Sequence, residues 1–140
     1  YMTKQTFKLA EVLQLHQELV GNEQIQGLLG LPMTMFAKFR LGKLVGELAK
    51  EVEAYQKVNE ELIKKYGEEK DGSFMIFNYV EDEKTKEKVL NPNLEKYSQE
   101  INPILQEEKE LEIPEIKIRD FQDTKVDGYY SVFFSKVVTE

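Results

Sequence analysis

The sequence predicts an α+β fold that is mainly α: a three-helix antiparallel arrangement around one long helix (about 34–66), with a small β-hairpin or sheet. The long helix is indicated by a proline-free stretch whose apolar residues follow a heptad period. A second indication is Asn91-Pro92, a capping residue followed by a first-turn proline, which is typical of a helix start. The hairpin is indicated by a turn sequence at residues 70–72 that precedes an aromatic segment.

Length and composition predict one folded domain over residues 1–140. The apolar and charged fractions, 41% and 32%, are typical of a folded chain with much surface helix. Cysteine is absent, which excludes disulfides, thiolate metal sites and cysteine nucleophiles. The expected segments are an N-terminal helical arm (1–33), the long helix (34–66), the hairpin (67–92), and a last region with the third helix, an edge strand and the C-terminal segment (93–140).

The N-terminal segment predicts an amphipathic helix that ends near Gly21, because its apolar residues recur at three- and four-residue steps. These residues are Phe7, Leu9, Val12, Leu13, Leu19 and Val20. We expect a short helical segment over Glu23–Leu29, followed by an interruption at Gly30 and Pro32. Thr34 is then expected to cap the long helix.

The long helix carries an apolar seam, which is expected to pack along a neighbouring helix and also allows a homo-oligomer. Its members are Leu41, Val45, Leu48, Val52, Tyr55, Asn59, Leu62 and Tyr66. Two interpretations of Asn59 are open: it fixes the packing register, or it is solvated at the rim beside Val58. Gly42 and Gly46 each cost about 1 kcal/mol relative to alanine inside a helix, so we expect a close approach there. Gly67 follows at the position of a C-terminal cap.

Beyond the long helix, the sequence predicts a strand over Phe74–Val80, a charged loop and a return strand over Lys86–Leu90. The third helix begins at Asn91-Pro92 and is expected to kink at Pro103. Its seam consists of Leu94, Tyr97, Ile101 and Leu105.

The C-terminal region predicts an edge strand and one ambiguous segment. The edge strand is expected over Ile113–Arg119, where apolar and charged residues alternate after Pro114. In Tyr129–Val138, residue propensity favours a strand, whereas the grouping of polar residues on one side of a helical wheel favours a helix. We favour the helix.

The reactive residues argue against catalysis. His16 is the only histidine, so neither a zinc site nor a Ser-His-Asp triad can form in the usual way. The glutamates of the long helix are expected to form a solvated face rather than an acid–base pair; they are Glu47, Glu51, Glu60 and Glu61. We therefore assign no catalytic, cofactor-binding or metal-ligating residue and no cofactor, and we do not expect an enzyme.

Residues 30–48 combine two phenylalanines, three cations and three glycines with one acidic residue. On a helical wheel, Phe36 and Phe39 lie away from the seam, and two of the cations lie beside them. Phe36, Phe39, Arg40 and Lys43 are therefore the candidate partner contact.

Three interpretations of this aromatic stretch are open. In the one that we favour, the first helix and residues 22–31 cover it and take at least one phenylalanine into the core. Arg40 and Lys43 are then left at the rim. In the second, the stretch binds a protein partner, because aromatic residues and arginine dominate interface energetics. The third, membrane association, is disfavoured by the acidic surface nearby.

Charge is spread unevenly along the chain, whose formal net charge is −7. Residues 1–46 carry five Lys and Arg against three Asp and Glu, whereas residues 47–140 carry fourteen against twenty-three. An acidic body repels phosphate backbones, so nucleic acid is not expected as a partner. The uncharged runs fall short of the ~20 residues that span a bilayer, and we expect neither a membrane span nor a signal peptide before Met2.

One segment carries a pattern of recognisable motifs, namely LGKLVGELAKEVEAYQKVNEELIKKYGEEKDG at Leu41–Gly72. It combines a long charged helix, a Tyr-Gly turn and a charged turn that ends in Asp-Gly, and a short strand and an acidic helix follow. The motif residues are Glu51, Tyr55, Leu62, Tyr66, Gly67, Asp71 and Gly72. Over about residues 35–120 the chain resembles a family of small uncharacterised proteins of tailed bacteriophages. The resemblance implies a phage or prophage origin, a location in the bacterial host cytoplasm or the virion, and no catalytic residue.

The leading hypothesis is a non-enzymatic bacteriophage protein that acts by protein–protein contact, as an assembly factor or minor virion component. The alternative is a phage-encoded inhibitor that binds a host enzyme or defence protein. In both, the partner is a protein of the phage or of its host.

Overall fold

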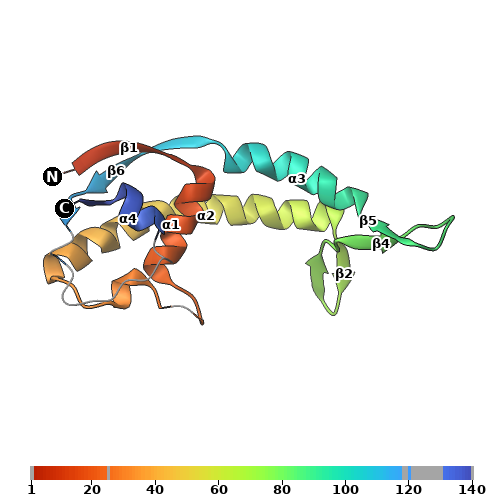
Figure 1. Cartoon of the computed structure of the whole chain (residues 1–140), viewed down its shortest axis with the longest axis horizontal. Helices are drawn as coiled ribbons and strands as arrows, with labels where there is room; N and C mark the ends of the chain where they lie inside the picture. Colours follow the sequence, from red (N-terminus) through yellow and green to blue (C-terminus); the bar gives the residue numbers. More distant parts are fainter. Residues whose placement is uncertain (1, 25, 118–119, 121–130, 140) are drawn as a thin grey trace. The chain divides into compact units, whose positions relative to one another are not determined.

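The computed structural model describes residues 2–24, 26–117, 120 and 131–139 (Figure 1). In chain order its elements are β1 (Met2–Lys8), α1 (Leu9–Val20), the 3₁₀ turn η1 (Leu28–Gly30), α2 (Met35–Tyr66), β2 (Glu68–Lys70), β3 (Ser73–Met75), β4 (Tyr79–Glu81), β5 (Lys88–Leu90), α3 (Pro92–Leu105), β6 (Glu108–Pro114), β7 (Ile116–Lys117), α4 (Ser131–Lys136) and β8 (Val138–Thr139). The predicted fold class is confirmed: the fold is α+β and mainly helical, with one long helix and small antiparallel strand pairs.

The chain divides into two units. Unit 1 consists of Tyr1–Glu53 and Glu107–Glu140, and unit 2 consists of Ala54–Gln106. Helix α2 contributes residues to both units. The single domain expected from the chain length stays a prediction.

The two ends of α2 are those that the sequence predicts. The Thr34 Oγ1 accepts a hydrogen bond of 3.2 Å from the backbone N–H of Ala37, so Thr34 caps the first turn. At the other end, the Gly67 N–H donates to the Ile63 carbonyl at 2.7 Å. A Cβ on Gly67 would clash with the carbonyl oxygens of Ile63 and Met75. Glycine is therefore required here because the main chain of the following hairpin approaches closely.

Strand β1 replaces the beginning of the expected N-terminal helix. Residues Met2–Lys8 pair antiparallel with Glu108–Pro114, and α1 begins only at Leu9. The expectation of a helix from Phe7 was therefore wrong by two residues. The cause is tertiary: the partner strand is too far along the chain for local periodicity to reveal it, and it takes Phe7 into a sheet where this ring is fully buried.

The same pairing corrects the expected edge strand. The main strand is β6, Glu108–Pro114, which lies upstream of the predicted Ile113–Arg119. Pro114 ends it, and β7 adds only Ile116–Lys117. Residues 118–119 of the prediction lie outside the described residues.

The core of unit 1 joins both ends of the chain. Its fully buried apolar side chains are Phe7, Val12, Leu15, Leu19, Leu28, Leu41, Leu48, Ile113, Ile116 and Phe133. On α2 the buried set includes Leu44, whereas Val45 of the predicted seam is half-buried. The buried residues of α2 differ from the seam expected for packing against a single helix, because this part of α2 also contacts β6. One such contact is the ion pair of 3.9 Å between Glu51 of α2 and Lys109 of β6.

Helix α4 is held by a buried carboxylate. Glu18 of α1 is fully buried, and its two oxygens accept from the backbone N–H groups of Phe133 at 2.9 Å and Val132 at 3.3 Å. These N–H groups belong to the first turn of α4. The Glu18 carboxyl group therefore supplies acceptors to the main chain at the start of α4.

The favoured helix in the tail is confirmed for Ser131–Lys136. Residues 129–130 lie outside the described residues. Val138–Thr139 form β8 instead, which pairs in parallel with β7. The tail therefore contains a helix, which periodicity favoured, followed by a short strand, which residue propensity favoured.

Lys136, at the end of α4, is a second link between α4 and the N-terminus. Its Nζ lies 2.9 Å from Glu11 Oε2, 3.3 Å from the Thr6 carbonyl oxygen and 4.7 Å from the centroid of the Phe7 ring. The hydrogen bond from Lys136 holds the pKa of the Glu11 carboxyl below its ordinary value of 4.5, and the backbone N–H of Lys8 acts in the same direction.

In unit 2, α3 runs antiparallel beside the C-terminal part of α2 (Figure 1). The predicted start of α3 is confirmed, since Asn91 Oδ1 accepts from the Asn93 N–H at 3.0 Å and Pro92 occupies the first turn. The half-buried Asn59 accepts a hydrogen bond from the Tyr97 hydroxyl. The interpretation of Asn59 as a solvated rim residue was therefore wrong: it pairs with one side chain of α3.

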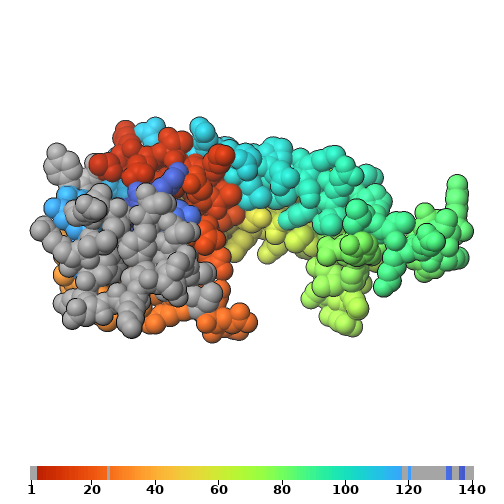
Figure 2. Space-filling view, in the orientation of Figure 1, coloured from red at the N-terminus to blue at the C-terminus, as the bar shows by residue number. Residues whose placement is uncertain are grey.

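Two hairpins replace the single hairpin expected in unit 2. Strands β2 and β3 pair around Asp71-Gly72, whose φ angles of 53° and 82° are typical of a tight type I′ turn. Strands β4 and β5 form the second hairpin, which projects from the rest of the unit in Figure 2. The expected strand Phe74–Val80 is divided between β3 and β4, and Asn91 donates hydrogen bonds to the carbonyls of Phe77 and Asn78, at 2.8 and 2.9 Å, just before β4.

Asn59→Leu should lower the free energy of unfolding by about 1 kcal/mol, because the Tyr97 hydroxyl loses its acceptor. Tyr97→Phe should cost a similar amount. In the double variant the loss of unfolding free energy should be smaller than the sum of the losses in the two single variants, since neither side chain is left with an unpaired polar group. Urea unfolding measures all three, with the exposed Gln56→Leu as a control that changes little. If the losses of the two single variants add up to that of the double variant, a direct hydrogen bond between Tyr97 and Asn59 is contradicted.

Lys136→Met should destabilise the fold by about 1 kcal/mol at neutral pH, because the partly exposed pair with Glu11 is lost. Since the native pKa of Glu11 is lowered, this pair stabilises the fold fully above pH 4.5 and loses its effect as the pH falls through the native pKa. The stability difference between wild type and variant should therefore narrow between about pH 7 and pH 3. Thermal melts over this range measure it, and a difference that does not change with pH would contradict the assignment.

Candidate functional site

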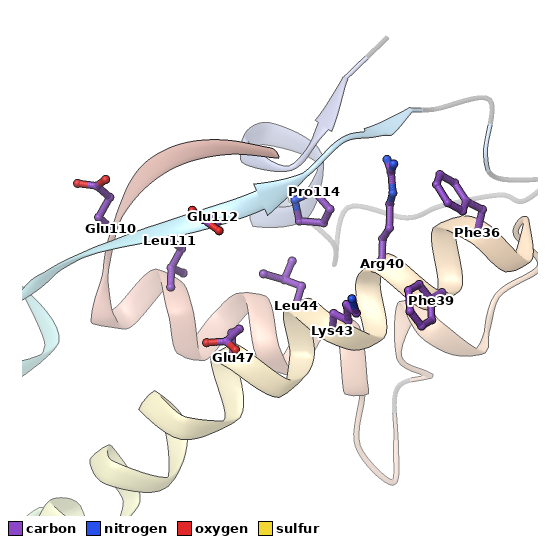
Figure 3. A pocket seen from close by; sticks show the side chains of 10 residues that line it. All are labelled: Phe36, Phe39, Arg40, Lys43, Leu44, Glu47, Glu110, Leu111, Glu112 and Pro114. Carbon is purple, nitrogen blue, oxygen red and sulfur yellow. The ribbon is translucent and has the colours of Figure 1, made fainter. Parts of the chain in front are cut away.

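An open groove of about 830 Å³ lies between the N-terminal part of α2 and β6, both in unit 1 (Figure 3). Helix α2 provides one wall and β6 the other. The lining residues are Phe36, Phe39, Arg40, Lys43, Leu44, Glu47, Glu110, Leu111, Glu112 and Pro114. The groove therefore contains all four residues of the predicted partner contact.

Phe36 and Phe39 are the most exposed aromatic side chains of this groove. Their exposed fractions are 63% and 62%, so the expectation that at least one belongs to the core was wrong. The core takes a different face of α2, that of Ala37, Leu41 and Leu44, which is about a third of a turn away on the helix. The segment that was expected to cover the rings instead buries Leu28.

Each phenylalanine carries a cation over its ring. The Arg40 guanidinium lies 4.1 Å from the centroid of Phe36, and the Lys43 ammonium lies 4.9 Å from that of Phe39. Arg40 also donates from Nη1 to the Glu115 carbonyl at 2.9 Å, which fixes its side chain between α2 and the end of β6. Such contacts pre-order long side chains, which reduces the entropy lost when a partner binds.

The opposite wall is acidic. Glu110 and Glu112 are both exposed on β6, and Glu110 lies 3.8 Å from Lys4 of β1. On the α2 wall, Glu47 pairs with Lys50 at 3.6 Å rather than with Lys43. The groove thus has a basic and aromatic wall on α2, and its other wall, β6, carries exposed glutamates.

The two helix glycines do not mark a close approach. A Cβ on Gly42 or Gly46 would meet no atom within 4 Å, so the expectation of a tightly packed neighbour was wrong. Both positions are exposed. They leave the surface of α2 beside the groove free of side chains, and their helix-propensity cost is not offset by packing within the described residues.

The lining residues contain no nucleophile placed beside a base. His16 is half-buried on α1, where desolvation lowers its pKa. Nowhere in residues 2–24, 26–117, 120 and 131–139 do three His, Cys, Asp or Glu side chains gather in a way that could hold a metal ion. Within the same residues, no helix combines the length and apolar character needed to cross a bilayer. The groups that line the groove are aromatic, aliphatic and charged side chains and one proline.

The sequence predicted the α2 wall but missed the β6 wall. Glu110, Leu111, Glu112 and Pro114 belong to a strand whose charged and apolar residues alternate over 110–113. That alternation is the signal from which the strand could have been predicted. Its position opposite α2 depends on the pairing with β1, which the sequence does not reveal.

No protein-family model, curated protein or solved structure matches this chain. The resemblance of Leu41–Gly72 to tailed-bacteriophage proteins therefore stays a prediction.

Phe36→Ala and Phe39→Ala should each lower the free energy of unfolding by less than about 1 kcal/mol, because most of each ring is already in water. Leu44→Ala, at a position only 3% exposed, is the control and should cost about 2–5 kcal/mol. Chemical denaturation compares them. A loss in the Phe36→Ala/Phe39→Ala variant as large as that of Leu44→Ala would show that the rings belong to the core.

Proposed function

We propose that this chain is a non-enzymatic protein that acts by protein–protein contact through the groove between α2 and β6. The observation that carries the proposal is the pair of exposed rings, Phe36 and Phe39, each beneath a cation at the groove. Aromatic side chains and arginine are the groups that most often dominate the energy of protein interfaces. Burying the two rings would supply apolar contact, and Arg40 and Lys43 would supply directed polar contact.

The mixed charge of the groove favours a protein over a nucleic acid. Arg40 and Lys43 line the groove together with Glu110 and Glu112 of β6, and Glu47 lies on the same wall as the cations. A phosphate backbone would meet these carboxylates along with the cations, and the net charge of −7 opposes it further. A polypeptide can match both signs, because it offers acidic, basic and apolar side chains.

The resemblance of Leu41–Gly72 supports a bacteriophage origin for this activity. We therefore propose a role as an assembly factor or minor virion component, exercised in the bacterial host cytoplasm or the virion. A partner encoded by the phage supports this role, whereas a host enzyme or defence protein as partner would support an inhibitor instead.

The test is capture of the partner from infected bacteria. The purified chain should retain a phage protein, and Phe36→Ala/Phe39→Ala should abolish its recovery without lowering the melting temperature by more than a few degrees. Phe74→Ala is a matched control, since this ring is 43% exposed but lies on β3 in unit 2. Equal recovery by the double variant and the wild type would contradict the proposal.

A further inference from the structure

We propose that the groove binds its partner by strand addition: an extended segment of the partner pairs with the free edge of β6 and places its alternate side chains against α2. The inference rests on the proposed protein-binding function and specifies how the groove recognises its partner and which chemistry the partner has.

The register of the sheet shows which main-chain groups of β6 are free. The Leu9 N–H donates to the Glu107 carbonyl at 2.9 Å, in line with the register that pairs Lys8 with Glu108. Hydrogen-bonded and non-hydrogen-bonded pairs alternate in an antiparallel ladder. Every second residue of β6 from 108 to 112 therefore points its N–H and C=O away from β1. These residues are Glu108, Glu110 and Glu112.

The far edge of β6 has no neighbour among the described residues. The sheet consists of β1 and β6 alone, and no described residue bonds to the main chain of these three glutamates on that side. The outer edge of β1 differs, because Lys136 binds the Thr6 carbonyl there at 3.3 Å. One edge of the sheet is thus partly covered, and the other has no strand partner within the residues that the structure describes. An open edge is a template for another strand.

The groove lies along this open edge. Its lining includes Leu111, whose side chain lies on the α2 side of β6, and also Glu110 and Glu112, whose side chains lie on the opposite, exposed side. A lining that includes three consecutive residues of a strand runs along its main chain, because neighbouring side chains point to opposite faces. Residues of β1 do not contribute to the lining, so this edge is the one away from β1.

Charge and register together define the incoming strand. The residues of the incoming strand opposite Glu110 and Glu112 place their side chains beside these glutamates, on the side of β6 away from α2. Basic side chains are therefore favoured at these positions. The residues of the incoming strand that lie between these positions point their side chains toward Leu44, Leu111 and the phenylalanine rings of the α2 wall. Apolar side chains fit there, whereas further cations are repelled by the cations that already lie over the rings. The partner segment therefore alternates basic or polar residues with apolar ones.

Strand β1 already shows this pattern on the other side of β6. It places Lys4, Thr6 and Lys8 opposite the three glutamates and directs the buried Phe7 inward. A second copy of β6 fits poorly, because antiparallel pairing of two such edges would set glutamates beside glutamates. The occupant is accordingly a basic, amphipathic strand of the partner.

The probe is a synthetic peptide of about nine residues in which lysine and valine alternate, added to the full chain and followed by calorimetry at about 0.15 M salt. We expect saturable binding and shifts of the Glu110 and Glu112 amide resonances in NMR spectra. A peptide with the same lysines and valines in two blocks should bind at least about tenfold more weakly, since alternation is lost. Glu110→Gln/Glu112→Gln should weaken binding of the alternating peptide.

N-methylation of the peptide distinguishes strand addition from simple charge attraction. We propose that the segment is added antiparallel to β6. The lysines then face the glutamates and pair with β6 through their N–H and C=O groups, whereas those of the valines point away. Methyl groups on the lysine amides should weaken binding by at least about tenfold, and methyl groups on the valine amides by much less. Equal binding of the two methylated peptides, or no binding of the parent peptide, overturns strand addition.

Two further outcomes separate this inference from the proposed function. If Phe36→Ala/Phe39→Ala abolishes partner capture while the peptides fail to bind, the protein-binding role stands and strand addition falls. If the chain is a dimer in solution that the peptide does not dissociate, a second copy occupies the edge and the inference is wrong. Peptide binding with the expected methylation pattern supports it even where capture is unaffected by the double variant.

Discussion

The antiparallel pairing of β1 with β6 is the constraint on which unit 1 depends. Its register runs from Met2 opposite Pro114 to Lys8 opposite Glu108, so it joins residues from both parts of a discontinuous unit. Closing so long a loop carries an entropic cost that local contacts cannot offset. Burial of Phe7 and Ile113 on the inner side of the sheet compensates it. The groove exists because this pairing sets β6 opposite α2.

The C-terminal segment then depends on β1 and α1. Glu18 supplies the acceptors for the first turn of α4, and Lys136 at its end reaches Glu11 and the Thr6 carbonyl. Gln5 adds a bond of 2.7 Å from its side-chain amide to the Lys136 carbonyl. A helix of six residues has little stability of its own. Its position is therefore determined by polar groups at both of its ends.

Features encoded locally could be predicted from the sequence, and features that need distant partners could not. The cap at Thr34, the length of α2 and the start of α3 follow from short-range signals. The pairing of β1 with β6 has no local signal. At least one of Phe36 and Phe39 was expected in the core because apolarity does not reveal whether a ring is covered. The bond from Tyr97 to Asn59 could not be predicted because it depends on how α3 aligns with α2.

The discontinuity of unit 1 has a consequence for the order of events during synthesis. Unit 2 is a run of consecutive residues, so all of its contacts become available while the ribosome is still adding β6. Strand β1 must wait for a partner that emerges roughly one hundred residues later. During that interval both of its edges are unpaired, and its lysines, Lys4 and Lys8, are of the kind that discourage association with other nascent chains. The groove is thus completed only after β6 has been translated.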